Sequence, residues 1–132
     1  MVINKVIIGG NIVSMEDLIT MENEKATQKF KFVIATNETW KVKDSDERKS
    51  KTQFTNVVVY GDKAKELSQI LYKGMPLMVE GKLNNYSYDN KDKEKKWWSE
   101  VVMFKYKTLD QIMSGSNATN IDNQLPIEQT ES

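Results

Sequence analysis

The order of hydrophobic periodicities along the chain is the feature that most restricts its fold. Five segments carry the apolar pattern of strands, at residues 3–8, 29–40, 52–60, 77–83 and 97–106. Between the third and fourth of them the period changes, and apolar residues recur at helical spacing at positions 64, 67, 70 and 71. We expect Asp62 to cap this helix, and Gly74 with Pro76 to end it.

A short helix between the third and fourth of five strands is the arrangement of the OB-fold. This fold is a five-stranded, partly open Greek-key barrel that binds oligonucleotides. The predicted fold class is therefore all-β, with an OB-fold domain at residues 1–109. We expect the first strand to end at Gly9-Gly10 in a turn or bulge, residues 15–25 to form an irregular connection, and residues 41–51 to form a charged hairpin loop. The core face of the fourth strand is expected to hold Leu77, Val79 and Leu83.

The chain changes character after Thr108, where the hydrophobic pattern fades and polar residues dominate. We expect residues 110–132 to be a short acidic disordered tail. All 19 basic residues and 15 of the 19 acidic ones lie in residues 1–109, which gives that part a net charge of +4. A mildly basic body favours an anionic partner, although an ordinary solvated surface can carry the same charge.

The chain has no cysteine and no histidine. This composition excludes disulfides, thiolate zinc sites, and catalytic arrangements of the Ser/His/Asp or Cys/His type. The only glycine pair is Gly9-Gly10, so there is no phosphate-binding or dinucleotide-binding loop motif. We therefore expect no enzymatic activity, no metal and no cofactor. No apolar run is long enough to span a bilayer and the N-terminus lacks a secretory pattern, which predicts a cytoplasmic protein.

Large aromatic residues gather at the roots of two charged hairpins. Strand alternation puts Tyr86 and Tyr88 on the polar face of their strand, together with Lys82. Rings on a polar face with lysines nearby form a platform on which nucleic-acid bases can stack while the lysines contact phosphates. The structural alternative is that these rings only stabilise the hairpin as cross-strand pairs.

Other residues extend this candidate surface. Trp40 precedes a lysine-rich loop, and Phe54 and Tyr60 share one face of the third strand. Trp97 and Trp98 are adjacent, so we expect one of them to point inward, but both alternating series are apolar and the pattern leaves the choice open. The predicted stacking residues are Trp40, Phe54, Tyr60, Tyr86, Tyr88 and Trp97. The predicted phosphate contacts are Lys41, Lys43, Lys82, Lys95 and Lys96, for which a solvated loop surface is the alternative reading.

Four motifs in order resemble the bacterial-type single-stranded DNA-binding protein family over about residues 2–109. They are NKVIIGGNI, FVIATNETWK, KTQFTNVVVYGDKAKELSQILYKGMPLMVEGKL and KKWWSEVV. The resemblance implies an OB-fold, a homotetramer, a nucleoid-associated location, and binding of single-stranded DNA without sequence preference in replication, recombination and repair. It also implies that Trp40, Phe54, Tyr60 and Tyr88 stack on bases.

The chain departs from the family pattern at several positions. The family often has tryptophan where this chain has Phe54 and Tyr88, and histidine where it has Thr55. The family's tail normally ends in an acidic cluster closed by proline and phenylalanine, whereas this chain ends in IDNQLPIEQTES. We therefore expect the tail to bind replication and repair proteins weakly. Two alternative functions stay open, namely an OB-fold replication-restart accessory protein and an RNA-binding OB module.

Overall fold

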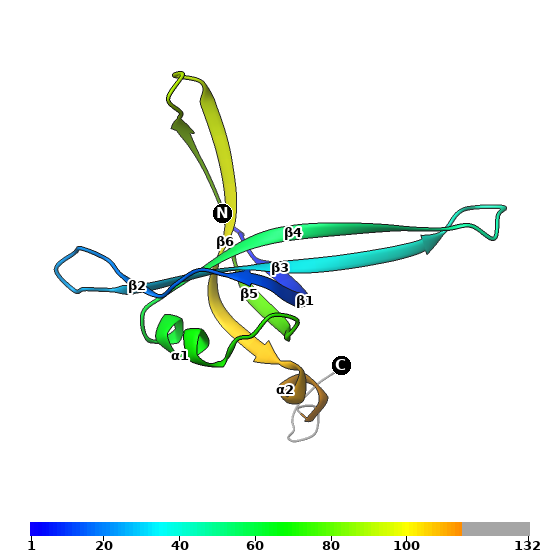
Figure 1. The fold of residues 1–132 in the computed structure, drawn as a ribbon, viewed down its shortest axis with the longest axis horizontal. Helices are drawn as coiled ribbons and strands as arrows, with labels where there is room; N and C mark the ends of the chain where they lie inside the picture. Colours follow the sequence, from blue (N-terminus) through cyan, green and yellow to red (C-terminus); the bar gives the residue numbers. More distant parts are fainter. Residues whose placement is uncertain (115–132) are drawn as a thin grey trace.

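Five long strands close into a barrel in the computed structural model, which describes residues 1–114 (Figure 1). They are β1 (Val6–Met15), β3 (Gln28–Lys41), β4 (Arg48–Tyr60), β5 (Pro76–Asp89) and β6 (Lys95–Thr108). They pair in the order β1-β5-β6-β4-β3, and β1 also pairs with β3, so the barrel is closed. All these pairs are antiparallel except β4 with β6. The predicted OB-fold is confirmed, and its five strands close a complete circle.

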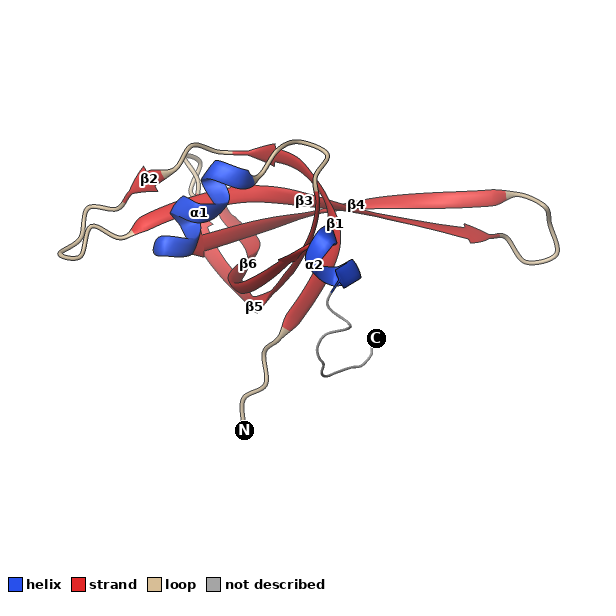
Figure 2. Ribbon diagram, turned by 90° about the horizontal axis from the view of Figure 1, so that it is seen from below, coloured by secondary structure: helices blue, strands red, loops and turns tan. Residues whose placement is uncertain are grey.

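The barrel core is built from the inward-facing residues of each strand and one face of the helix. The α1 helix (Asp62–Ile70) follows β4 in the chain, as the change of period predicts, and lies against the barrel beside β3 (Figure 2). Its Ala64 and Leu67 are fully buried against side chains such as Phe32 of β3. Gly61 is the N-cap and Asp62 is the first helical residue, so the prediction that Asp62 caps the helix is wrong. The helix also ends at Ile70, ahead of the expected stop.

Two hairpins extend well beyond the barrel, one formed by β3 and β4 and the other by β5 and β6 (Figure 1). The inward-facing series of β5 is buried at Leu77, Val79 and Gly81, but Leu83 is exposed. The prediction that Leu83 belongs to the core is wrong, because β5 extends there beyond its pairing with β1, which ends at Gly81. The β4 strand begins at Arg48, so residues 41 and 48–51 of the expected loop are paired strand, and only residues 42–47 connect the two strands.

The first strand does not stop at its glycine pair. β1 pairs with β5 up to Asn11 and with β3 from Asn11 onward, and its register shifts between Ile12 and Ser14. A Cβ atom on Gly10 would lie 2.2 Å from the carbonyl oxygen of Ala35. The glycine therefore lets two strands approach closely where β1 passes between its partners. The prediction that the strand ends at this pair in a turn or bulge is wrong, because β1 continues to Met15 and its register shift comes only after Ile12. In the expected irregular connection, β2 (Ile19–Thr20) pairs with the start of β3.

A short helix, α2 (Leu109–Ser114), follows β6 directly. The Thr108 hydroxyl accepts a hydrogen bond from the Gln111 backbone N–H, and the Gln111 side chain accepts one from the Thr108 N–H. This reciprocal pair is a capping box, a signal that the sequence analysis overlooked. The prediction that disorder begins at residue 110 is therefore wrong for residues 110–114, and the rest of the predicted tail lies outside the described residues. Within residues 1–114, no helix is long and apolar enough to cross a membrane.

Candidate nucleic-acid interface

Four aromatic side chains lie on the outer side of the barrel sheet. Val57 and Val59 of β4 point into the core, so the strand's pleat turns Phe54 and Tyr60 outward. On β5, Leu77 and Val79 point inward, and the same alternation turns two tyrosines outward. We call the resulting surface the outer aromatic face, and it consists of Phe54, Tyr60, Tyr86 and Tyr88.

The rings of the outer aromatic face are open to solvent. The exposed fraction is 67% for Phe54, 39% for Tyr60, 39% for Tyr86 and 50% for Tyr88. None of the four belongs to the buried core cluster. Large contiguous apolar patches are rare on the surface of a monomeric protein, so a group of exposed rings on one face is a candidate binding surface.

Beneath these rings lies a buried carboxylate that the sequence analysis missed. Glu100 of β6 is 6% exposed and accepts a hydrogen bond of 3.1 Å from the indole Nε1 of Trp98. Burial, and then the negative charge of Glu100, raise the pKa of Tyr60 and the pKa of Tyr86. Glu100 stands just before the apolar run from Val101 to Phe104, and the local sequence pattern does not mark it as buried.

The register of the β5–β6 hairpin separates the two adjacent tryptophans. Trp98 is paired with Tyr86 and shares its face, where it is half-buried. Trp97 is paired with Ser87 on the opposite face and is 71% exposed. The amino group of Lys95 lies 5.4 Å from the Trp97 ring centroid, a cation–π contact. Trp97 thus lies on the same face of β6 as the residues that point into the core, but at its position beyond the barrel there is no core for the side chain to pack in.

Trp40 lies on the corresponding face of the other hairpin. It is paired with Lys49 of β4, on the face that continues the core side of β3, and is exposed. Of the six predicted stacking residues, four therefore gather on the outer aromatic face. Trp40 and Trp97 lie on the reverse faces of the two hairpins, and the structure does not join them to the other four.

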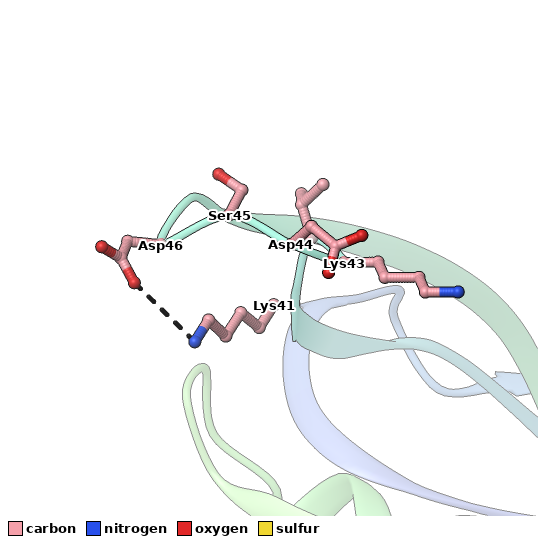
Figure 3. Close-up of a pocket in the computed structure, with 6 residues that line it drawn as sticks. Lys41, Lys43, Asp44, Ser45 and Asp46 are labelled. Atoms are coloured by element: carbon pink, nitrogen blue, oxygen red, sulfur yellow. Dashed lines mark ion pairs between the residues drawn. The ribbon is translucent and has the colours of Figure 1, made fainter.

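The predicted lysines are spread over both hairpins. Lys41 and Lys43 belong to a hollow at the tip of the β3–β4 hairpin, where Lys41 pairs with Asp46 at 3.8 Å (Figure 3). On the β5–β6 hairpin, Lys82 shares the face of the tyrosines, and Lys96 is the cross-strand neighbour of Tyr88. Lys96 also pairs with Glu94 at 3.5 Å.

Two further lysines, Lys29 and Lys31, were not among the predicted site residues. Lys29 is the cross-strand neighbour of Tyr60, and its amino group lies 6.0 Å from the ring centroid. Lys31 lines the same small hollow as Trp98 and Glu100. The alternation of β3 already puts both on the outer side of the sheet, because Phe30 and Phe32 face the core. Their nearness to Tyr60 and Glu100 depends on pairing with a distant strand.

Chemically, this surface combines exposed π-faces with mobile cationic groups. The rings offer stacking surface to unpaired bases, and the lysines offer point charges to phosphates without a fixed geometry. Residues 1–114 contain no cluster of three or more acidic side chains that could hold a metal ion. The arrangement therefore suits non-covalent binding of a single nucleic-acid strand.

Comparison with known proteins agrees with this geometry. The model of the "Single-strand binding protein family" matches residues 3–109. The chain is 27% identical over 118 residues to single-stranded DNA-binding protein 1 of Xylella fastidiosa (strain 9a5c), an alignment that covers 89% of this chain and 85% of the relative. Among solved structures, the Plasmodium falciparum SSB in complex with ssDNA superposes with a TM-score of 0.72 at 25% identity, covering 83% of this chain and 97% of the other.

Proposed function

This chain belongs to the single-strand binding protein family, and we propose that it coats and protects single-stranded DNA in replication, recombination and repair, without preference for base sequence. The observation that carries the proposal is the outer aromatic face, where four exposed rings from β4 and β5 lie beside lysines on one side of the sheet. Stacking is tolerant of sequence because every base has a π-face. Members of this family are binding proteins, and we propose that this chain has no enzymatic activity.

In the proposed complex, bases stack on Phe54, Tyr60, Tyr86 and Tyr88. The exposed rings of Trp40 and Trp97 stack on bases of those DNA segments that pass along the reverse faces of the hairpins. Phosphates follow the lysines, namely Lys41, Lys43, Lys82, Lys95 and Lys96. Each stacked base is worth about 1–3 kcal/mol, and each neutralised phosphate lowers the logarithm of the binding constant by about 0.7 per tenfold rise in salt.

We further propose that residues 1–109 are the DNA-binding domain and that the protein is a homotetramer in the nucleoid. An open apolar groove beside α2 supports self-association, because Ile7 of β1 and Leu109 and Ile112 of α2 line it and are all partly exposed. For the tail, we propose weak binding of replication and repair partners, because residues 110–132 contain no aromatic side chain that could anchor in a partner's pocket. Native mass spectrometry tests the assembly, and a monomer at micromolar concentration would contradict it.

Tryptophan emission titrated with oligo(dT) tests the DNA-binding proposal. We expect quenching on binding, affinity that falls with salt, and much weaker binding of duplex DNA of the same length. A matched RNA strand in competition separates the two nucleic acids, since tighter binding of RNA would favour an RNA-binding module. Equal affinity for duplex and single strands would contradict the proposal.

A further inference from the structure

Glu100 is the only buried charged side chain among the described residues 1–114. Its carboxylate accepts the hydrogen bond from Trp98, lies near the hydroxyls of Tyr60 and Tyr86, and forms no ion pair within that part of the chain. Burying a carboxylate is costly unless hydrogen bonds compensate for the lost water. A chain that only needed to pack this face could have used an apolar residue here, so the retained charge calls for an explanation.

The charges on this side of the sheet are arranged around that carboxylate. Glu100 accepts the hydrogen bond of Trp98, and its charge acts on Tyr60 and Tyr86. The hollow that Glu100 lines also holds Lys31 and a second carboxylate, Glu16.

Two further lysines lie beside the rings. Lys29 is close to the Tyr60 ring, and Lys96 is the cross-strand neighbour of Tyr88 and pairs with Glu94. The face therefore has a buried negative charge with lysines, and some acidic partners, around it. A low-dielectric surrounding strengthens the field of a buried charge, so Glu100 should repel an approaching phosphate more than a surface carboxylate would.

We propose that Glu100 makes the outer aromatic face select bases over phosphates, so that a bound strand turns its bases onto the rings and its backbone toward the lysines. The proposal rests on single-strand binding as proposed above. Without the charge of Glu100, the face with its lysines would also accept the sugar–phosphate backbone. The backbone of the bound strand would then cover the rings, and its bases would not stack on them. Glu100 is thus a specificity-determining residue that need not contact the strand.

The test compares two labelled strands of equal length at low salt, one of oligo(dT) and one abasic sugar–phosphate chain. The variant Glu100→Gln keeps an oxygen that can accept the Trp98 hydrogen bond and removes the charge. We expect its affinity for the abasic strand to rise at least about fivefold and its affinity for oligo(dT) to rise less than about twofold, because only a misplaced phosphate approaches this side chain. The ratio of the two affinities, which measures base selection, should therefore fall.

The control is Asp92→Asn, at an exposed acidic residue in the turn of the same hairpin. It also removes one negative charge, and it should raise both affinities by the same small factor, leaving the ratio unchanged. If Glu100→Gln alters the ratio no more than this control does, or weakens both strands equally, Glu100 only supports the packing of the rings and the proposal is overturned.

A second variant keeps the test decisive if Glu100→Gln does not fold. Asn84 is the exposed cross-strand neighbour of Glu100, and Asn84→Asp adds a second charge to the same face without touching the core. Binding of the abasic strand should fall more than binding of oligo(dT), so the ratio should rise, whereas Asn85→Asp on the opposite face should leave it unchanged. An unchanged ratio in Asn84→Asp overturns the proposal. Failure of the unmodified protein to bind oligo(dT) would instead refute the proposed function.

Discussion

Replacing Tyr88 with alanine removes one ring of the outer aromatic face with little effect on the fold. The ring is 50% exposed, so about 100 Å² of a tyrosine's surface of roughly 200 Å² is free to meet a base. At about 25 cal/mol per Å² this area is worth about 2.5 kcal/mol, within the range of about 1–3 kcal/mol for one stacked base. We expect Tyr88→Ala to raise the dissociation constant for oligo(dT) by about 5- to 150-fold.

The stability of the same variant should change much less than its affinity. Tyr88 is paired with Lys96 across the hairpin and lies outside the buried core, so truncation forfeits a cross-strand contact of about 0.2–1 kcal/mol. Tyr72→Ala is the matched control. Tyr72 is similarly exposed, at 59%, and comes just after the end of α1 in the chain. Figure 1 shows α1 on the other side of the barrel from the β5–β6 hairpin.

Fluorescence anisotropy of a labelled oligo(dT), with thermal unfolding followed by circular dichroism, measures both quantities. Tyr72→Ala should bind like the unmodified protein. The reasoning is refuted if Tyr88→Ala binds as tightly as Tyr72→Ala, because its ring then contacts no base. It is also refuted if Tyr88→Ala loses several kcal/mol of stability, because the ring is then a structural element of the hairpin.

Three further predictions concern the barrel and the tail. Gly10→Ala should lower the free energy of unfolding by about 1–3 kcal/mol in denaturant titrations, because its Cβ would meet the carbonyl oxygen of Ala35 at 2.2 Å. The neighbouring Gly9→Ala has contacts no closer than 3.9 Å, so it should be neutral or raise the free energy of unfolding by up to about 1 kcal/mol. Burial and then the hydrogen bond to Glu66 raise the pKa of Tyr106 to about 12, so folding favours the neutral phenol. The contribution of Tyr106 to the free energy of unfolding should therefore be complete below pH 10 and should be lost as the pH rises toward 12. In urea unfolding over that range, the stability of the unmodified protein should fall relative to Tyr106→Phe, and parallel curves would contradict this. Residues 115–132 hold three acidic and no basic residues. Deleting them should tighten oligo(dT) binding about two- to fivefold at low salt and have no effect at high salt. If the deletion variant and the full chain bind with equal affinity at both salt concentrations, electrostatic competition by the tail is excluded.

The order of elements was predictable because it depends on local periodicity. Alternation at residues 29–40 and 52–60 and helical spacing at Ala64 and Leu67 each act within a few residues, and the structure follows them. The course of β1 was not predictable. Gly10 is glycine because β3 approaches it at Ala35, a neighbour 25 positions away in sequence, and local pattern contains no such information.

The candidate site, too, has features that local alternation predicts and features that it does not. Alternation from the buried Leu77 and Val79 correctly puts Tyr86 and Tyr88 on the outer face, because the strand continues without interruption. Alternation could not choose between Trp97 and Trp98, since both series around them are apolar. Nor could it reveal that Glu100 is buried, because the groups beside it come from β4 and β5 as well as from its own strand. The stacking and phosphate roles of these residues remain predictions.

The reverse face of the β5–β6 hairpin yields the last prediction. Trp97 and Lys95 are in cation–π contact there, on the side opposite Tyr86 and Tyr88. A strand bound along the outer aromatic face can reach Trp97 only by continuing around the edge of the hairpin, which a short strand cannot do. OB-folds occupy about 4–16 nucleotides, so Trp97→Ala should leave the affinity for an oligo(dT) of about 8 nucleotides unchanged and weaken binding of one of about 30 nucleotides by about 1–3 kcal/mol. Tyr88→Ala, by contrast, should weaken both. Anisotropy titrations of the two lengths decide the matter. Equal loss on both lengths in Trp97→Ala would mean that even a short strand contacts both faces, and no loss on either would mean that Trp97 serves another purpose.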